Sequence, residues 1–291
     1  MKYFIGINWF ILSLVISSLN DTISRYLSIE ISPLQTSFFR FFFGALSLIP
    51  FIWYQGLKSI QTSKPMVHFF RGTFLAIGIF FWIKGLGSVQ VATATIISFT
   101  IPIFILVMAS IFLKEKVSMK LYLLTMVGLF GIFVALKPYD ITLNMDMLLL
   151  VTAAILFASL DIINKKYIIK ETMLSMLFYS SVITTLLALI PVLINIKSWQ
   201  TPSMIDLFYL MILGLGSNLI LFCLLKAFYL VKVSSLAPFR YLELLVSIAL
   251  GYLVFGELPS SYTYIGALII IPVSLYIVLD KKKSEKKYEE L

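Results

Sequence analysis

The chain carries little charge for its length. Of 291 residues only 13% are charged, whereas 60% are hydrophobic, and the mean hydropathy is +1.00. A soluble domain is about one-quarter charged, because its surface meets water on every side. The composition therefore excludes an ordinary soluble protein and indicates an outer surface in contact with lipid. At about 25–30 residues for each span and its turn, the length accommodates about ten or eleven transmembrane helices.

Cysteine and histidine are almost absent. The single cysteine, Cys223, excludes a disulfide within the chain, and no Cys/His set has the spacing of metal ligands. A Ser-His or Cys-His catalytic pair would depend on the single histidine, His68, between Lys64 and Arg71. We interpret that basic stretch as a cytoplasmic loop. We therefore expect no metal, no cofactor and no enzymatic activity.

Two short motifs are also missing. No P-loop pattern Gly-x4-Gly-Lys-Ser/Thr is present, so transport by this chain would not draw on ATP bound to it. No Gly-x-x-x-Gly pattern for helix dimerisation occurs, and we expect a monomer. The net charge of +9 does not indicate a nucleic-acid partner, because the positive residues lie between apolar runs rather than along one face.

What the sequence does contain is a series of apolar runs, each long enough to cross ~30 Å of hydrocarbon at about 1.5 Å per residue. None shows the sustained alternation of a transmembrane β-strand. We predict an all-α membrane protein of about ten transmembrane helices, with spans at 3–20, 34–54, 67–86, 91–112, 120–136, 147–164, 173–194, 204–225, 233–255 and 262–279.

Lysine and arginine set the predicted orientation. With a cytoplasmic N-terminus, the inside segments hold 16 of these residues, and the outside segments hold 3, namely Arg25, Lys137 and Lys197. The positive-inside rule then places both termini in the cytoplasm. The multi-pass chain is expected in the bacterial inner membrane, and the lysines of the tail 281–291 would favour its anionic inner leaflet.

An internal repeat is the most informative pattern. Residues 81–86 (FWIKGL) resemble 223–228 (CLLKAF), and residues 112–117 (FLKEKV) resemble 254–259 (VFGELP), both at an offset of 142. Five spans per copy is an odd number, so the second copy must be inverted relative to the first. We predict a first repeat at 1–142, a second, inverted repeat at 143–280 and a cytoplasmic basic tail at 281–291. Inverted repeats are typical of secondary transporters, whose substrate site lies near the midplane.

These features resemble a known family. Ten spans in two repeats, Lys84 and Lys226, Arg40 in span two, and Glu115 and Glu257 after spans four and nine are similar to the EamA group of the drug/metabolite transporter superfamily. The resemblance covers nearly the whole chain and implies a secondary carrier. Its motifs are shared by importers and exporters, so they do not fix the substrate.

Ionisable groups inside a membrane are costly, and each is a functional candidate. Glu243 lies about 15 Å into span nine by helical rise, Arg240 is three residues earlier, and Pro238 loosens the local hydrogen-bond ladder. One interpretation is a neutralised pair that locks helices together. The other is a site for a zwitterion, with Arg240 facing a carboxylate and Glu243 an amine or sulfonium.

Other polar residues receive weaker assignments. Asp21 and Asp161, offset by 140, fall near opposite faces of the bilayer; Asp161 is expected to cap a helix end, while Asp21 either caps or meets substrate. Arg40 is expected to be structural, and Lys84, Lys226, Glu115 and Glu257 to anchor span ends. Side chains placed toward the cavity are Trp9, Trp82, Phe99, Tyr241, Thr95, Ser98 and Asn218.

The resemblance leads us to expect uptake of a small zwitterionic or cationic metabolite by alternating access or exchange. Taken whole, the chain is similar to S-adenosylmethionine carriers within that family. The carboxylate of S-adenosylmethionine would meet Arg240, its ammonium and sulfonium Glu243 and Asp21, and its adenine the aromatic rings. An amino-acid or drug exporter of the same family is the alternative.

Overall fold

The computed structural model describes residues 2–86, 91–136, 145–256, 258 and 260–289. Every regular element within them is helical. The elements are α1 (Lys2–Leu27), α2 (Pro33–Ser47), α3 (Ile49–Gln55), η1 (Leu57–Ile60), α4 (Pro65–Leu86), α5 (Val91–Ser98), α6 (Ile101–Phe112), α7 (Met119–Leu136), α8 (Met145–Tyr167), α9 (Met173–Ile194), η2 (Ile196–Ser198), α10 (Met204–Leu230), α11 (Val233–Leu236), η3 (Ala237–Tyr241), α12 (Leu242–Phe255) and α13 (Ser261–Glu289).

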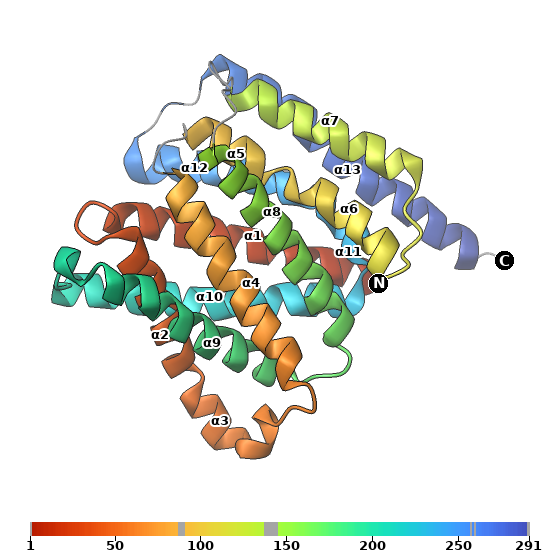
Figure 1. Cartoon of the computed structure of the whole chain (residues 1–291). Coiled ribbons are helices and arrows are strands. Elements are labelled where there is room, and N and C mark those ends of the chain that lie inside the picture. Colours follow the sequence, from red (N-terminus) through yellow and green to blue (C-terminus); the bar gives the residue numbers. More distant parts are fainter. Residues whose placement is uncertain (1, 87–90, 137–144, 257, 259, 290–291) are drawn as a thin grey trace.

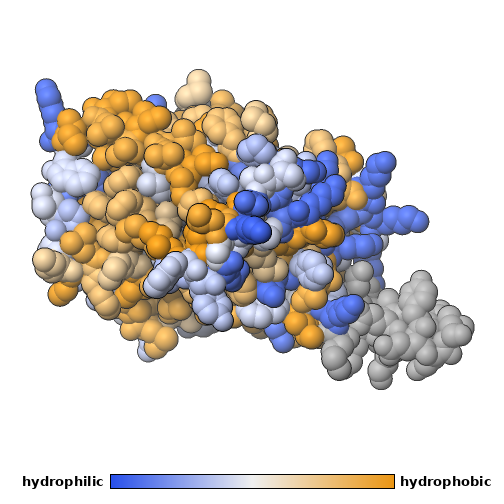
Figure 2. Space-filling model, turned by 90° about the horizontal axis from the view of Figure 1, so that it is seen from below, coloured by the Kyte–Doolittle hydropathy of each residue, from blue (hydrophilic) through white to orange (hydrophobic). Residues whose placement is uncertain are grey.

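The surface of the helical bundle is apolar. Within the described residues, nine helical segments are long and apolar enough to cross a membrane, and Ser261–Tyr276 of α13 is a shorter apolar stretch. Large hydrophobic side chains such as Trp53 and Leu123 are exposed, and hydrophobic residues cover most of the face in Figure 2. Such a surface is stable only against lipid. The prediction of an all-α membrane protein is confirmed.

The two halves pack with matching partners (Figure 1). In the order of the repeat, α1 corresponds to α8, α2 to α9, α4 to α10 and α7 to α13. The helix α1 packs against α10 and α8 against α4, while α2 packs against α9 and α7 against α13. Exchanging every helix for its counterpart leaves this set of contacts unchanged, as expected for repeats related by a pseudo-two-fold axis.

The repeat is also visible in how helices begin. The hydroxyl of Ser32 accepts a hydrogen bond from the Gln35 backbone N–H at 3.3 Å at the start of α2. Thr172, 140 residues later, accepts one from the Ser175 N–H at 3.0 Å at the start of α9. Such N-caps satisfy one of the unpaired N–H groups of a first helical turn. Equivalent caps therefore begin equivalent helices.

Two predicted loop residues lie inside the bundle instead. His68 and Arg71 belong to α4 and are 1% and 0% exposed, so their assignment to a cytoplasmic loop is wrong. Arg71 Nε donates to Asn164 Oδ1 at 2.7 Å, and His68 Nε2 lies 3.4 Å from Glu171 Oε2. These partners come from α8 and the α8–α9 turn and offset the cost of burying the two groups. Without Arg71 the positive-inside count is 15 against 3.

The residues predicted to anchor span ends, and the predicted tail, have different positions in the structure. Glu115 accepts hydrogen bonds from the backbone N–H groups of Val233 at 3.2 Å and Ser234 at 3.1 Å, so it joins the α6–α7 turn to the start of α11. Glu257 and Lys137 lie outside the described residues. The helix α13 extends to Glu289, and the predicted basic tail therefore begins as a continuation of the last helix.

Candidate functional site

Two broken helices occupy equivalent places in the two repeats. The fourth span is divided between α5 and α6 at Phe99 and Thr100, next to Pro102. The ninth span runs as α11, then a 3-10 turn containing Pro238, then α12. Proline removes a backbone donor and breaks the helical ladder. Broken helices at matching positions of inverted repeats are the usual location of a transporter's substrate site.

A polar cavity lies between these helices and the rest of the bundle. It consists of two adjacent volumes of about 480 and 610 Å³ that share Asp21, Trp82 and Phe157 in their walls. Sites for small molecules commonly measure about 300–1,000 Å³. The cavity extends to one end of the molecule, where Ser28 of the α1–α2 turn and Ser260 of the α12–α13 turn line it.

A further groove of about 800 Å³ between α1, α3, α9 and α10 has no ionisable side chain in its wall. We assign it to lipid contact.

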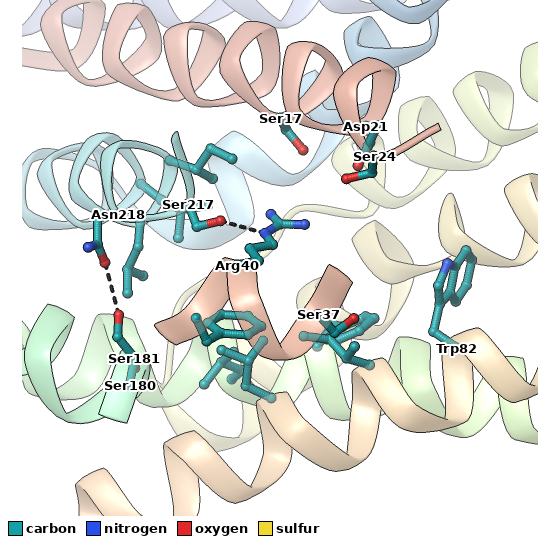
Figure 3. A pocket seen from close by; sticks show the side chains of 18 of the residues that line it. Ser17, Asp21, Ser24, Ser37, Arg40, Trp82, Ser180, Ser181, Ser217 and Asn218 are labelled. Atoms are coloured by element: carbon teal, nitrogen blue, oxygen red, sulfur yellow. Dashed lines mark hydrogen bonds between the residues drawn. The ribbon is translucent and has the colours of Figure 1, made fainter. Parts of the chain in front are cut away.

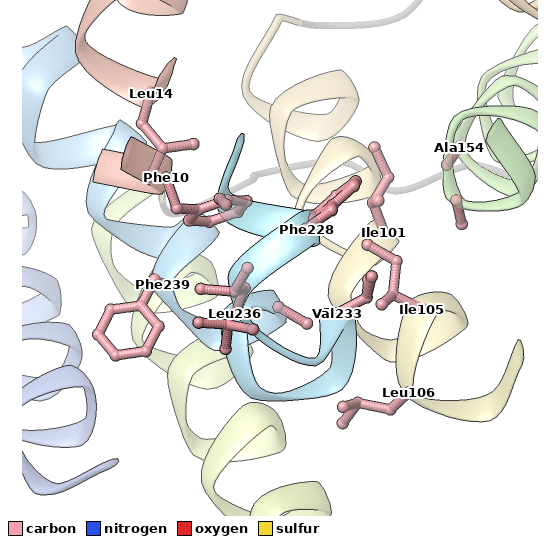
Figure 4. Close-up of a cluster of buried hydrophobic side chains, with 14 of the residues drawn as sticks. Phe10, Leu14, Ile101, Ile105, Leu106, Ala154, Phe228, Val233, Leu236 and Phe239 are labelled. Atoms are coloured by element: carbon pink, nitrogen blue, oxygen red, sulfur yellow. The ribbon is translucent and has the colours of Figure 1, made fainter. Parts of the chain in front are cut away.

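The other end of the bundle is closed. Side chains from α1, α6, α10, α11 and η3 pack together there, among them Phe10, Ile105, Phe228, Leu236 and Phe239, as the close-up in Figure 4 shows. Polar contacts reinforce the closure: Lys165 Nζ donates to the backbone carbonyls of Phe228 and Val231 at the end of α10. The cavity is therefore open at one end of the bundle and closed at the other.

Arg240 has a different partner from the predicted one. Its guanidinium donates to Asp161 Oδ2 at 2.6 Å, and the two side chains are only 17% and 9% exposed. Of the two interpretations, the locking pair therefore exists with Asp161 as the partner of Arg240 in place of Glu243. The predicted helix-capping role of Asp161 is wrong, because this residue lies within α8 and lines the cavity. Since Asp161 and Arg240 come from α8 and η3, their ion pair joins parts of the chain that local spacing cannot relate.

Glu243 and Asp21 are brought to one place. Glu243 lies in the first turn of α12, and the wall that holds it also includes Asp21 and Ser247. Asp21 belongs to α1 and is exposed to the cavity although it lies within a span. The hydroxyl of Ser18 is within 3.2 Å of that of Ser247, which joins α1 to α12 beside the two carboxylates.

Five more predicted residues line the cavity, and Thr95 of α5 is one of them. Trp82 faces it in Figure 3, and Phe99 and Ser98 lie at the break between α5 and α6. The Ser98 hydroxyl donates to the Thr95 carbonyl at 2.7 Å, within its own helix. Asn218 lines the cavity but holds helices together: its Nδ2 donates to the Gly44 carbonyl at 2.6 Å, and its Oδ1 accepts from Ser181 at 3.0 Å.

Two predicted aromatics do not reach the cavity. Tyr241 is fully buried, packs against Phe99, and donates its hydroxyl to the Thr125 carbonyl at 3.0 Å. Trp9 packs against Phe222 with ring centroids 5.9 Å apart at an interplanar angle of 87°. Both rings stabilise helix packing instead, which corrects the prediction that they face the substrate.

The sequence analysis missed several polar residues of the cavity. Arg40, expected to be structural, lines it together with Arg71, Asn164, Ser17 and Ser217. The signal for Arg71 was present, since this residue lies inside the apolar run 67–86. For the serines there was none, because serine is common in membrane helices.

Two repeats, paired broken helices and a polar cavity that opens at one end define a transporter of the inverted-repeat class. Comparison with known proteins is consistent with this: the EamA-like transporter family matches the chain twice, over residues 4–137 and 144–279. The chain belongs to that family.

Its relatives extend over the whole length. The S-adenosylmethionine uptake transporter of Rickettsia bellii is 47% identical over 98% of this chain and 97% of its own length, and that of Rickettsia prowazekii is 46% identical over 99% and 97%. A riboflavin transporter of Rhizobium johnstonii is 26% identical over 97% and 94%. One crystal structure superposes with a TM-score of 0.80 over 98% of both chains at 16% identity, which shows a common fold alone.

Proposed function

We propose that this chain takes up S-adenosylmethionine across the bacterial inner membrane by alternating access. The observation that carries the proposal is the pair of carboxylates, Asp21 and Glu243, that share one cavity wall inside the membrane. Carboxylates at such a depth are expensive unless a cation meets them. S-adenosylmethionine offers two cations, an ammonium and a sulfonium. The two rickettsial relatives reported above, which carry its name, support the same substrate.

The aromatic walls suit the rest of the molecule. Trp82 and Phe157 line both volumes of the cavity, and Phe99 lines the second. An aromatic face attracts a cation placed over it and also stacks on a flat base. A sulfonium beside a carboxylate and an adenine against a ring would use the polar and apolar parts of this wall.

Alternating access follows from the repeats at 1–142 and 143–280. With both termini in the cytoplasm, the turns at Ser28 and Ser260 face outward, and the structure is outward-open. In the inward-open state the two repeats would exchange conformations, sealing these turns and separating the side chains of the closed end. Each chain has its own cavity, so a monomer suffices for transport.

The alternative within the family is an exporter of amino acids or drugs. Inverted repeats make both access states natural, so direction depends on gradients. Riboflavin, named in more distant relatives, has no fixed cation and gives no reason for two carboxylates in one wall. An integral-membrane enzyme is disfavoured by the transporter family of the chain.

The test is uptake of labelled S-adenosylmethionine into proteoliposomes that contain only the purified chain, without ATP. We expect saturable uptake that unlabelled S-adenosylmethionine blocks and riboflavin does not, and faster uptake with unlabelled substrate inside if the carrier exchanges. Asp21→Asn should lose most of this uptake at normal abundance, whereas Lys197→Gln, at an exposed position in η2, should keep it. A strict ATP requirement, or equal inhibition by riboflavin, would overturn the proposal.

A further inference from the structure

Two arginines, Arg40 and Arg71, line the cavity, and a third, Arg240, lies next to it as the partner of the lining residue Asp161. Arg71 and Arg240 are both bound to protein groups. Arg240 forms the ion pair with Asp161 at 2.6 Å. Arg71 is fully buried, with Nε donating to Asn164 at 2.7 Å and one terminal nitrogen donating to the Met176 carbonyl at 3.2 Å. One nitrogen of each group, Arg71 Nη2 and Arg240 Nε, has no hydrogen-bond partner but is buried, so a substrate carboxylate would have to disturb the existing contacts to bind either guanidinium. That cost disfavours both as anion sites.

Arg40 on α2 is arranged differently. Its Nε donates to the Ser217 hydroxyl, which in turn donates to the Leu213 carbonyl at 2.7 Å. The serine proton is thus used by the carbonyl, and the oxygen is left as an acceptor that holds the guanidinium by one edge. In the described part of the chain the two terminal nitrogens of Arg40 have no hydrogen-bond partner, and Figure 3 shows the guanidinium directed into the cavity between Ser217 and Asp21.

A guanidinium edge with two unpaired N–H groups binds an anion in a specific geometry. Two parallel N–H donors match the two oxygens of a carboxylate, and such bidentate contacts are stronger and more directional than a contact to lysine. Arg40 is half-buried in a region lined by serine hydroxyls and apolar side chains. Partial burial strengthens its attraction for an anion relative to the same contact in bulk water.

The neighbour of Arg40 supplies the opposite charge. Asp21 interacts electrostatically with Arg40, yet no ion pair within 4.0 Å joins these two described residues. An acid and a base that face one cavity without closing on each other leave room for a ligand that carries both charges. An α-amino acid carries its carboxylate and ammonium on a single carbon, side by side, and can bridge them.

We propose that Arg40, positioned by Ser217, binds the substrate carboxylate while Asp21 binds the neighbouring ammonium, so that the site selects an α-amino acid head group. This inference rests on the proposed function and replaces Arg240 in the predicted role. Glu243, which lines the second volume together with Asp21 whereas Arg40 lines the first, is then left for the sulfonium. Each charge of S-adenosylmethionine has one partner in this arrangement.

The experiment varies the ligand and the protein together. Binding of S-adenosylmethionine and of its analogue without the carboxylate is measured by competition against labelled S-adenosylmethionine in the purified full chain. Arg40→Gln should weaken S-adenosylmethionine about ten- to a hundredfold and change the analogue far less. Arg40→Lys keeps the positive charge but not the two parallel N–H donors, so its affinity for S-adenosylmethionine should lie between those of the parent and Arg40→Gln. Lys197→Gln, which removes an exposed positive charge, is the matched control.

If Arg40→Gln fails to reach the membrane, the same binding comparison is made with Ser217→Ala. It keeps the guanidinium but removes its support, and a selective loss for the carboxylated ligand upholds the proposal. Equal losses for the two ligands, in whichever of these variants is folded, overturn it while leaving the proposed function intact. A parent protein that does not bind S-adenosylmethionine overturns the proposed function, and this assignment with it.

Discussion

The carboxylate of Asp161 and the guanidinium of Arg240 lie 2.6 Å apart and join α8 to the 3-10 turn of the broken ninth span. Both side chains are largely buried, and both belong to the second repeat. The pair fixes the break in that span against a neighbouring helix at the closed side of the cavity. The direct ion pair of Arg240 is thus with Asp161, although the spacing of three residues had suggested Glu243.

Removing one member of this pair should destabilise the carrier. Asp161→Asn or Arg240→Gln leaves a buried charge unpaired, which typically costs about 3–5 kcal/mol. The double variant removes both charges and should recover much of the loss. Thermal unfolding in detergent and membrane abundance measure this. Two singles and a double with additive losses would mean that the ion pair has no energetic role.

Glu243→Gln should act on transport and not on folding. Since Arg240 is paired with Asp161, the change strands no positive charge. Loss of one charged contact to the substrate is worth about 1.5–3 kcal/mol, or about ten- to a hundredfold in affinity. Uptake and abundance are compared with Glu30→Gln, which removes an exposed carboxylate in the α1–α2 turn. Full transport by the double variant Arg240→Gln with Glu243→Gln would refute the assignment of Glu243 to the site.

The contact of α2 with α10 predicts unequal effects at two facing glycines. A Cβ at Gly214 would lie 2.6 Å from the Gly44 backbone N, whereas a Cβ at Gly44 would find its nearest neighbour, the Gly214 carbonyl oxygen, at 3.4 Å. Gly214→Ala must separate the two backbones and should lower stability by about 1–3 kcal/mol. Gly44→Ala makes only an ordinary contact and serves as the control. Equal melting temperatures for the two variants would contradict the close packing.

Orientation is open to a separate test. Reporter fusions after Lys64, Lys116 and Lys232 should report cytoplasm, and a fusion after Gln200 the outside, because the positive residues cluster on one side. An outside signal at Lys116 would invert the proposed outward-open assignment.

Much of the fold was readable from the sequence. Apolar runs and the offset of 142 are local or additive signals, and a bilayer converts them directly into helices and repeats. The matched break in the fourth span was also available from Pro102, although Pro238 alone was recognised. Depth along a helix was therefore predicted well enough to place Asp21, Trp82, Phe99 and Glu243 at the cavity.

Rotation about each helix was decided only by tertiary structure. These helices are hydrophobic nearly all round, so the apolar pattern does not distinguish a lipid-facing side from a cavity-facing one. For that reason Tyr241 and Trp9 were placed wrongly. Arg240 could meet Glu243 by local spacing, but the fold brings Asp161 from 79 residues away to a better position. The sequence determined which charges enter the membrane, and the packing of the two repeats decided which of them pair and which remain free for substrate.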